Sequence, residues 1–226
     1  RDTLQYGSGF WIKYGSEGPL TFDGEPRYND TVAVNAGWNI IGSLSFPVPA
    51  SSITEQPASI VVSRYFGYDG AYVPADSLRP LQGYWVKTHA PGKLVISSSS
   101  MVPAKASIKG TGDEFENLSS LTFEDPAGHR QILRLGTMSP EQQRLGSYEL
   151  PPVPPEGAFD VRFGDGNSVA QIAMEETNGD QKISIVLQTS STPVSVTSNI
   201  TGPMISSIVI MDGTRAFPIP DGHRIE

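Results

Sequence analysis

The stretch Gly83-Tyr84-Trp85-Val86-Lys87 decides the fold, because the chain contains the same pattern a second time as Gly9-Phe10-Trp11-Ile12-Lys13. In each copy a glycine precedes an aromatic ring, a tryptophan, a β-branched residue and a lysine. Each copy is followed by a turn and a second apolar run, Leu94-Val95-Ile96 or Leu20-Thr21-Phe22. Aromatic and β-branched residues favour strands, and internal repetition indicates a modular architecture. The sequence therefore predicts repeated β-modules.

The composition also favours an all-β chain. Its 226 residues include 23 glycines and 19 prolines, and only 18% of them are charged. Such a composition is typical of short strands joined by tight turns. In the segment 183–188 the apolar Ile183, Ile185 and Leu187 occupy alternate positions, which predicts a strand with one buried face. Residues 140–148 are the only segment in which we expect a short helix.

Charge and residue content exclude several classes of function. A net charge of −8 does not suit a protein that binds nucleic acid or an anionic membrane surface. No run of apolar residues approaches the length of a membrane span. The absence of cysteine excludes disulfides, thiolate metal sites and cysteine nucleophiles. Because the sequence begins with Arg1 and shows no signal peptide, we expect a mature product or a fragment.

Turn clusters divide the chain into four expected parts. Residues 1–22 have the pattern of the closing hairpin of a preceding repeat, and residues 23–100 that of a complete β-module. Residues 101–117 are small, polar and weakly patterned, as in a linker. Residues 118–226 contain enough short strands for a β-sandwich of immunoglobulin-like size. The predicted fold is two tandem β-sandwich modules preceded by a hairpin.

The individual strands are predicted from short runs of β-forming residues between turns. In the first module an irregular connection is expected at 47–57, and strands at 31–34, 37–42, 60–66, 71–73, 83–87 and 93–96. In the second module strands are expected at 121–123, 131–135, 159–163, 168–173, 182–188, 194–198, 208–211 and 215–218. A turn at Asp125-Pro126-Ala127-Gly128 separates the first two of them.

A proline-rich segment lies between strands of the second module. Pro151, Pro152, Pro154 and Pro155 force an extended polyproline-like conformation that cannot be a central strand. Together with Gly37-Trp38-Asn39-Ile40-Ile41-Gly42 and the Gly83–Lys87 pattern, this segment resembles the C-terminal β-domain region of large secreted proteins of the Bacteroidota–Chlorobi–Ignavibacteria lineage. Those proteins are substrates of type IX secretion. The sorting domain itself, with its Asn-Pro-Phe-rich opening, is not in this sequence. The resemblance implies export and an extracellular or cell-surface location, and it implies no catalytic activity.

Aromatic residues are the leading candidates for contacts with a ligand. Trp11, Trp38, Tyr84 and Trp85 lie within or beside apolar strands, where packing in a core is favoured over a platform for sugar rings. Another group of rings surrounds an expected hairpin tip, where exposure is more frequent. A structural role is still favoured for these rings, but they are the candidate ligand-binding residues: Tyr65, Phe66, Tyr68 and Tyr72.

The sequence contains no recognisable metal or catalytic motif. Asp165, Asn167 and Asp180 offer oxygen ligands of the kind that calcium takes, but they complete no calcium-binding loop, so turns are the favoured interpretation. His89, His129 and His223 have no zinc-binding spacing and are expected in solvated loops. No cofactor is predicted. An enzyme whose site is spread over loops would require close, buried carboxylates that a sequence cannot show.

Two functional hypotheses remain from these observations. The first is a non-catalytic structural or adhesive segment of an exported bacterial protein, whose partners are neighbouring modules or identical subunits. In such an assembly the Trp11 hairpin would pack against the module that contains Trp38 and Trp85. The second is a carbohydrate-binding accessory module of a secreted enzyme that acts on extracellular polysaccharide.

Overall fold

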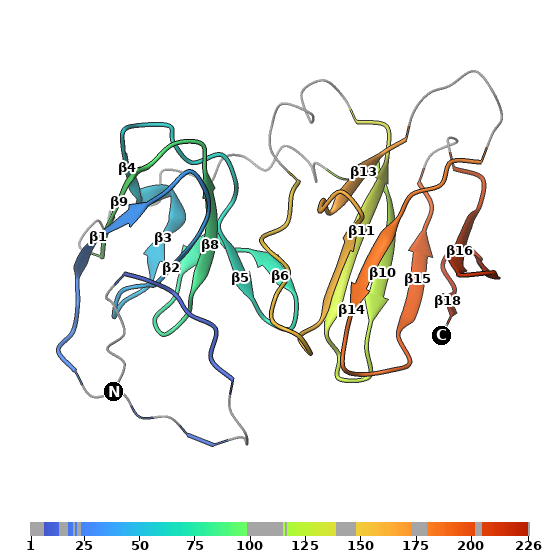
Figure 1. Ribbon diagram of the computed structural model, residues 1–226, viewed down its shortest axis with the longest axis horizontal. Helices are drawn as coiled ribbons and strands as arrows, with labels where there is room; N and C mark the ends of the chain where they lie inside the picture. Colours follow the sequence, from blue (N-terminus) through green and yellow to red (C-terminus); the bar gives the residue numbers. More distant parts are fainter. Residues whose placement is uncertain are drawn as a thin grey trace. The chain divides into compact units, whose positions relative to one another are not determined.

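The computed structural model of the protein consists of β-sheets gathered into two compact units (Figure 1), and its strand pairs are antiparallel except for the parallel pair of β11 and β13. The structure describes residues 7–13, 18–19, 21, 24–98, 115, 117–138, 148–172, 180–201 and 205–225. The first unit is drawn from Arg1–Tyr68 and Val73–Ser107, and the second from Asp69–Tyr72 and Ile108–Glu226. The described residues include no α-helix, and the all-β prediction is confirmed. The helix expected at 140–148 falls almost wholly on residues outside the described ranges.

The first unit contains three sheets and one short helical turn. The sheet orders are β1-β9-β4, β2-β8-β5-β6 and β3-β7. A 3-10 turn, η1 (Ala50–Ser52), lies between β3 and β4. The strands are β1 (Asn29–Val34), β2 (Gly37–Ile41), β3 (Val48–Pro49), β4 (Thr54–Gln56), β5 (Phe66–Tyr68), β6 (Tyr72–Pro74), β7 (Ser77–Leu78), β8 (Tyr84–Thr88) and β9 (Gly92–Ser97).

The repeated motif explains the centre of this unit. Successive side chains of a strand point to opposite faces, and in β8 the residues Tyr84, Val86 and Thr88 are buried while Trp85 and Lys87 lie on the other face. Tyr84 and Val86 of β8 share one core cluster with residues of both larger sheets. Its other members include Val32, Val34, Ile41, Leu94 and Ile96.

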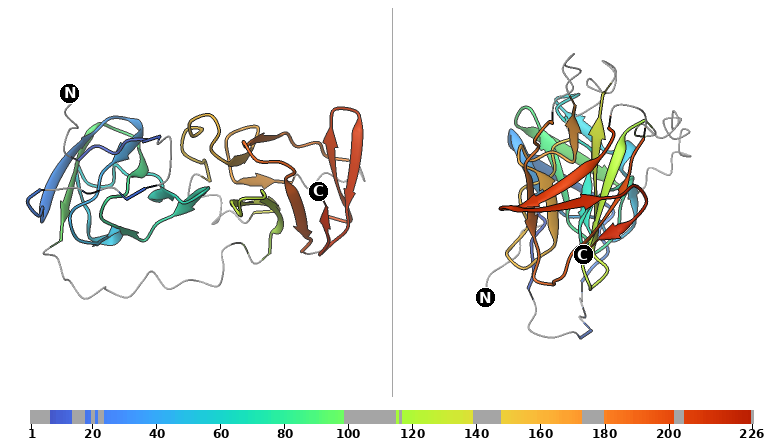
Figure 2. Two further views of the ribbon diagram at one scale, coloured as in Figure 1. Left: turned by 90° about the horizontal axis from the view of Figure 1, so that it is seen from below. Right: turned by 90° about the vertical axis from the view of Figure 1, so that its right-hand side faces the viewer.

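The second unit is built around a five-stranded sheet with the order β13-β11-β10-β15-β18. Strands β12 and β14 form a second, two-stranded sheet, and β16 and β17 form a hairpin near the C-terminus (Figure 2). The strands are β10 (Ser119–Glu124), β11 (Arg130–Gly136), β12 (Asp160–Phe163), β13 (Val169–Gln171), β14 (Ile185–Gln188), β15 (Ser195–Asn199), β16 (Ile208–Asp212), β17 (Arg215–Ile219) and β18 (Arg224–Ile225).

The core of the second unit contains side chains from the five-stranded sheet and from β12. Leu121, Leu133, Phe159 and Val161 are among its buried members. The expected turn between β10 and β11 is confirmed: the N–H of Gly128 donates to the carbonyl oxygen of Asp125 (3.0 Å), and Gly128 has a φ of +84°. Glycine adopts this left-handed conformation without the steric cost that a side chain would add.

Most of the strand predictions are confirmed to within a few residues, but three segments of the first unit differ. The connection expected at 47–57 contains β3 and β4. In the strand expected at 60–66, the backbone N–H of Lys87 donates to the Ser63 hydroxyl (2.8 Å) instead of to a backbone carbonyl, so the ladder is interrupted and β5 begins only at Phe66. In the expected closing hairpin, residues 10–14 form the first strand, but 10–13 belong to no strand and Tyr14 lies outside the described residues.

The segment that carries the first copy of the motif adjoins β2. Ser8 forms an isolated bridge with Ile41, and the N–H of Gly9 donates to the carbonyl of Ile40 (3.2 Å). A β-carbon on Gly9 would lie 2.7 Å from Cγ1 of Ile40 and 2.8 Å from the carbonyl oxygen of Ile41. Glycine at this position therefore permits the close approach of residues 7–9 to the edge of β2.

Candidate ligand-binding site

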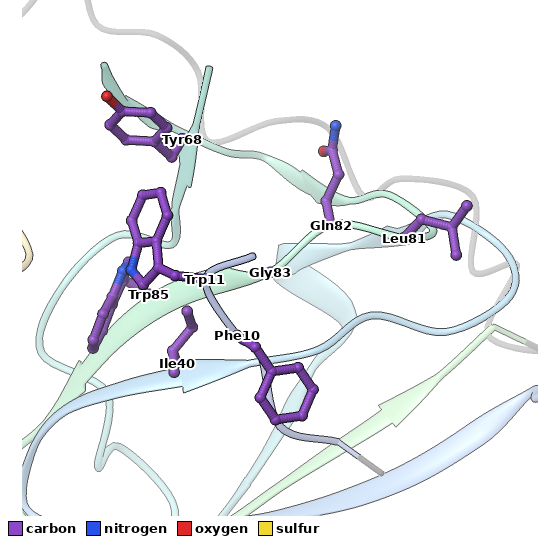
Figure 3. Close-up of a pocket in the computed structure, with 8 residues that line it drawn as sticks. All are labelled: Phe10, Trp11, Ile40, Tyr68, Leu81, Gln82, Gly83 and Trp85. Carbon is purple, nitrogen blue, oxygen red and sulfur yellow. The ribbon is translucent and has the colours of Figure 1, made fainter. Parts of the chain in front are cut away.

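An aromatic hollow lies on the face of the β2-β8-β5-β6 sheet that is turned away from the core of the first unit. It has a volume of about 210 Å³. Alternation places Ile40 of β2, Trp85 of β8 and Tyr68 of β5 on this face. The complete lining, drawn in Figure 3, is Phe10, Trp11, Ile40, Tyr68, Leu81, Gln82, Gly83 and Trp85.

Trp11 and Tyr68 form the exposed aromatic wall of the hollow. Their ring centroids are 4.8 Å apart and their planes meet at 74°, which is a favourable edge-to-face contact. The Trp11 side chain remains 39% exposed. Figure 3 shows Trp11 and Phe10 extending in different directions from the segment that carries both. An indole that packs edge-to-face on one tyrosine and keeps 39% of its surface exposed can accept a planar or ring-shaped ligand on the exposed part.

Gln82 supplies a positioned amide at the rim of the hollow. The hydroxyl of the buried Tyr84 accepts a hydrogen bond from the backbone N–H of Arg79 (2.7 Å). The same hydroxyl donates to Oε1 of Gln82 (2.7 Å), so the amide oxygen is held while the side chain stays exposed. This arrangement leaves the Nε2 hydrogen atoms of Gln82 as donors for a ligand.

Trp85 adds a second polar group to the wall of the hollow. Its Nε1 is buried and has no hydrogen-bond partner among the described residues. A buried N–H without an acceptor costs about 1–3 kcal/mol, so this atom is a local source of instability beneath the wall of the hollow. Trp38 lies on the same face of the sheet, where its ring contacts Phe66 (centroids 6.0 Å apart) and the ammonium of Lys87 (5.9 Å).

The tryptophans do not belong to the core, contrary to the favoured sequence interpretation. Trp11 is exposed, and Trp38 and Trp85 are only partly buried. Strand alternation is the physical reason, because it assigns the core to Tyr84 and Val86 and turns Trp85 outward. Tyr84 is buried as expected.

Of the four rings proposed from the hairpin tip, only Tyr68 lines the hollow. Tyr65, Phe66 and Tyr72 are buried, so the greater exposure expected at a hairpin tip is not found at these three positions, and burial agrees with the structural role that was favoured for them. Burial and the neighbouring Glu55 carboxylate raise the pKa of Tyr65, which remains neutral. The hydroxyl of Tyr72 donates to the carbonyl oxygen of Pro152 (2.7 Å), a bond within the second unit.

The proline-rich segment of the second unit lies outside the strands, as expected. Its carbonyl oxygens accept hydrogen bonds from side chains of the two-stranded β12-β14 sheet. Nη1 of Arg162 donates to Pro151 (2.8 Å), and Nε2 of Gln188 donates to Pro154 (3.2 Å) and Pro155 (3.1 Å). These bonds tie the segment to the domain, so its carbonyl groups are occupied by its own chain.

The candidate calcium ligands are explained by turn geometry. Oδ1 of Asp165 accepts the backbone N–H of Asn167 (3.0 Å), and the N–H of Phe163 donates to the carbonyl of Asn167 (2.9 Å). Asp180 is exposed. The described part of the chain contains no cluster of three acidic or histidine side chains that could hold a metal ion.

A pairing that sequence reasoning missed joins Asp125 to His129 across the β10–β11 turn. Oδ2 of Asp125 lies 2.9 Å from Nδ1 of His129. His129, which was expected in a solvated loop, is therefore hydrogen-bonded to Asp125. Burial alone would raise the pKa of Asp125, but hydrogen bonds from the ring and backbone of His129, its charge, and the N–H of Ala127 lower it overall. The signal was an Asp and a His four residues apart across an expected hairpin turn.

The buried carboxylates do not form a catalytic pair. Asp125 and Asp160 are the buried acids among the described residues, and each is bonded to its own basic partner, His129 or Arg162. The only hydroxyl bonded to this Asp125–His129 pair within the described residues is that of Thr189, which donates to the aspartate (3.4 Å) rather than to the histidine. The Asp125–His129 pair therefore fits a structural role, in which it stabilises the β10–β11 turn.

No protein-family model, curated protein or solved structure matches this chain. The described residues form no helix with the length and hydropathy that crossing a membrane would require. The hollow around Trp11 is accordingly the feature on which a functional proposal can be based.

Proposed function

We propose that the chain is a non-catalytic adhesive segment of an exported bacterial surface protein, and that it binds carbohydrate in the aromatic hollow of the first unit. The observation that carries the proposal is the open indole of Trp11, which is held edge-to-face by Tyr68 beside the positioned amide of Gln82. An aromatic surface with a few fixed polar groups is typical of small-ligand sites.

Carbohydrate is the ligand class that matches this chemistry. A pyranose ring has an apolar face of C–H groups that packs on an indole, and hydroxyl groups at its edge that need donors and acceptors. In the hollow, the exposed part of the Trp11 indole supplies the apolar surface, Tyr68 supports it edge-to-face, and Nε2 of Gln82 supplies donors. The residues that line the hollow carry no charge, so a neutral sugar is favoured over an anionic ligand.

The remaining architecture is consistent with a module in an extended surface protein. We infer that each unit is a β-sandwich of immunoglobulin-like size, because each core cluster combines side chains from more than one sheet. The resemblance of the Gly37–Gly42, Gly83–Lys87 and proline-rich stretches to secreted β-domains supports export, and the repeated motif supports attachment to neighbouring modules. No nucleic-acid partner or inserted membrane segment is proposed.

Trp11→Ala is expected to weaken binding to a polysaccharide by at least about tenfold, by analogy with nucleic-acid bases, whose stacking on one aromatic side chain contributes about 1–3 kcal/mol. The measurement is pull-down of the intact chain on a panel of insoluble glucans, xylans, mannans and chitin, with tryptophan fluorescence titration for soluble oligosaccharides.

The matched control for Trp11 is Tyr28→Ala. Tyr28 is also an exposed ring, stacked on Phe46 with centroids 4.9 Å apart, and it does not line the hollow. Binding to any member of the panel that Tyr28→Ala preserves and Trp11→Ala removes supports the proposal. Absence of binding across the panel, or equal losses in both variants, would refute it.

Tyr84→Phe tests the role of the Gln82 amide. Removing the hydroxyl deletes the acceptor for the N–H of Arg79 and the donor to Gln82, which is expected to cost about 1–2 kcal/mol of stability. It is also expected to weaken carbohydrate binding severalfold while leaving the stacking surface in place. Urea unfolding and the same fluorescence titration measure the two effects, and Gln82→Ala should reproduce the second with a smaller loss of stability, because the bond from Arg79 to the Tyr84 hydroxyl remains.

A further inference from the structure

Leu81, at the rim of the aromatic hollow, is an exposed leucine in a backbone conformation that leucine rarely adopts. It lies in the connection 79–83 between β7 and β8, and its φ is +62°. Its side chain is 80% exposed, more than any other large hydrophobic side chain that the structure describes. A single exposed leucine is common in proteins, but a branched side chain in the left-handed region is uncommon and is opposed by steric repulsion.

The left-handed conformation affects how the rim of the hollow is built. In an extended chain two consecutive side chains point to opposite faces, yet Leu81 and Gln82 both line the hollow. The backbone at Leu81 interrupts the extended alternation shortly before β8 begins. In Figure 3 both residues are drawn at the right of the hollow and Trp11 at its left. Unfavourable backbone conformations that a fold retains cluster at ligand-binding sites, so the strain indicates that Leu81 contacts the ligand.

The polar part of the same rim offers hydrogen-bond donors and few acceptors. The side-chain acceptors among the lining residues are the Tyr68 hydroxyl and Oε1 of Gln82. Oε1 of Gln82 already accepts from the Tyr84 hydroxyl (2.7 Å), so the amide presents its Nε2 hydrogen atoms. A donor of this kind is matched by a carbonyl oxygen, which only accepts, better than by a hydroxyl group, which also has a proton to place.

We propose that the hollow selects sugars that carry an N-acetyl group, with the acetamido methyl group against Leu81 and the acetamido carbonyl oxygen bonded to Nε2 of Gln82. This inference rests on the carbohydrate-binding function proposed above and names its substrate class. The pyranose ring packs on the exposed part of the Trp11 indole. The acetamido group is neutral, which agrees with the uncharged lining of the hollow.

A sugar that carries hydroxyl groups alone makes less use of this rim. A hydroxyl group in place of the acetamido group leaves the Leu81 side chain in water, where its exposed apolar surface contributes nothing to binding. The acetamido group removes that surface from water and brings a pure acceptor to the adjacent Gln82. The selectivity therefore comes from two consecutive residues, one apolar and one polar, that act on the two ends of one substituent.

The test compares tri-N-acetylchitotriose with cellotriose, two trisaccharides that differ in the substituent at C2 of each ring, by tryptophan fluorescence titration of the intact chain. We expect the unmodified chain to bind the acetylated trisaccharide at least about tenfold more tightly. Leu81→Gly suits the left-handed backbone and removes an exposed side chain, so it should keep the thermal unfolding midpoint. It should weaken binding of tri-N-acetylchitotriose about three- to fivefold, the effect of one buried methyl group, and leave cellotriose unchanged.

Val73→Ser is the matched control, because Val73 is another exposed aliphatic residue of the first unit and does not line the hollow. It should preserve both affinities. Equal affinities of the unmodified chain for the two trisaccharides would overturn the selectivity and leave the carbohydrate function standing. A preference that Leu81→Gly retains in full would also overturn it, since Leu81 would then not contact the acetamido group. Absence of binding to both trisaccharides would refute this inference, while the polysaccharide panel decides the carbohydrate function separately.

Discussion

Arg162→Leu is expected to lower the free energy of unfolding of the second unit by about 3–5 kcal/mol, the usual effect of removing one partner of a buried ion pair. Arg162 and Asp160 are both buried in β12. Nε and Nη2 of the guanidinium donate to the two carboxylate oxygens at 2.6 and 2.7 Å, and Nη1 donates to the carbonyl of Pro151 at 2.8 Å. Leucine leaves the carboxylate charged, buried and unpaired.

Two further variants distinguish the loss of this ion pair from the general cost of mutating a buried residue. Arg162→Lys retains the charge but not the planar two-pronged contact, so it should be destabilising by an intermediate amount. The double variant Asp160→Leu/Arg162→Leu removes both charges and should recover much of the loss, because well-packed apolar pairs often replace buried ion pairs without cost. A double variant as unstable as Arg162→Leu alone would contradict this account.

The two units can be followed with different probes in this experiment. Trp11, Trp38 and Trp85 all lie in the first unit, so tryptophan fluorescence reports on that unit. Far-ultraviolet circular dichroism reports on strands of both units. Urea unfolding of Arg162→Leu should therefore show an early transition in the dichroism signal, and a dichroism curve that superimposes on that of the unmodified protein would refute the prediction.

The sequence was sufficient to predict the all-β class, the β10–β11 turn and most strands, because these features depend on local patterns. Strand alternation and turn residues such as those at Asp125–Gly128 act over a few neighbours along the chain. The pattern of Gly83–Lys87 likewise predicted a strand. It did not show which face of that strand is buried, since its aromatic residues occur on both faces: Tyr84 belongs to the core and Trp85 lies in the hollow.

The candidate site could not be predicted in full, because it depends on contacts between distant segments. Trp11 meets Tyr68, which lies 57 positions later in the chain (68 minus 11), and Tyr84 orients Gln82 through a bond that no spacing rule signals. Burial of Tyr65, Phe66 and Tyr72 also results from tertiary packing. An expected hairpin tip indicates exposure only when no other part of the domain covers it.

Asp125→Asn is expected to destabilise the second unit by about 2 kcal/mol at neutral pH, because hydrogen bonds to a charged acceptor are among the stronger ones. Oδ1 of Asp125 accepts the backbone N–H groups of Ala127 (2.9 Å) and His129 (3.0 Å), and Oδ2 accepts from the His129 ring (2.9 Å). These bonds close the β10–β11 hairpin. An asparagine can replace one oxygen but presents an NH₂ group in place of the other.

The pH dependence of that variant identifies the carboxylate as the source of the effect. The pKa of Asp125 in the folded chain lies below its ordinary value of 3.8. The charged form therefore adds stability that is complete above pH 3.8 and is lost as the pH falls through the lowered pKa. The difference in unfolding free energy between the unmodified protein and Asp125→Asn should shrink over that acidic range.

Asp165→Asn, which alters an exposed turn aspartate with a similar backbone bond, should show a much smaller difference at neutral pH. If the difference in unfolding free energy between the unmodified protein and Asp125→Asn stayed constant as the pH fell, the shape of the Asp125 side chain and not its charge would stabilise the hairpin.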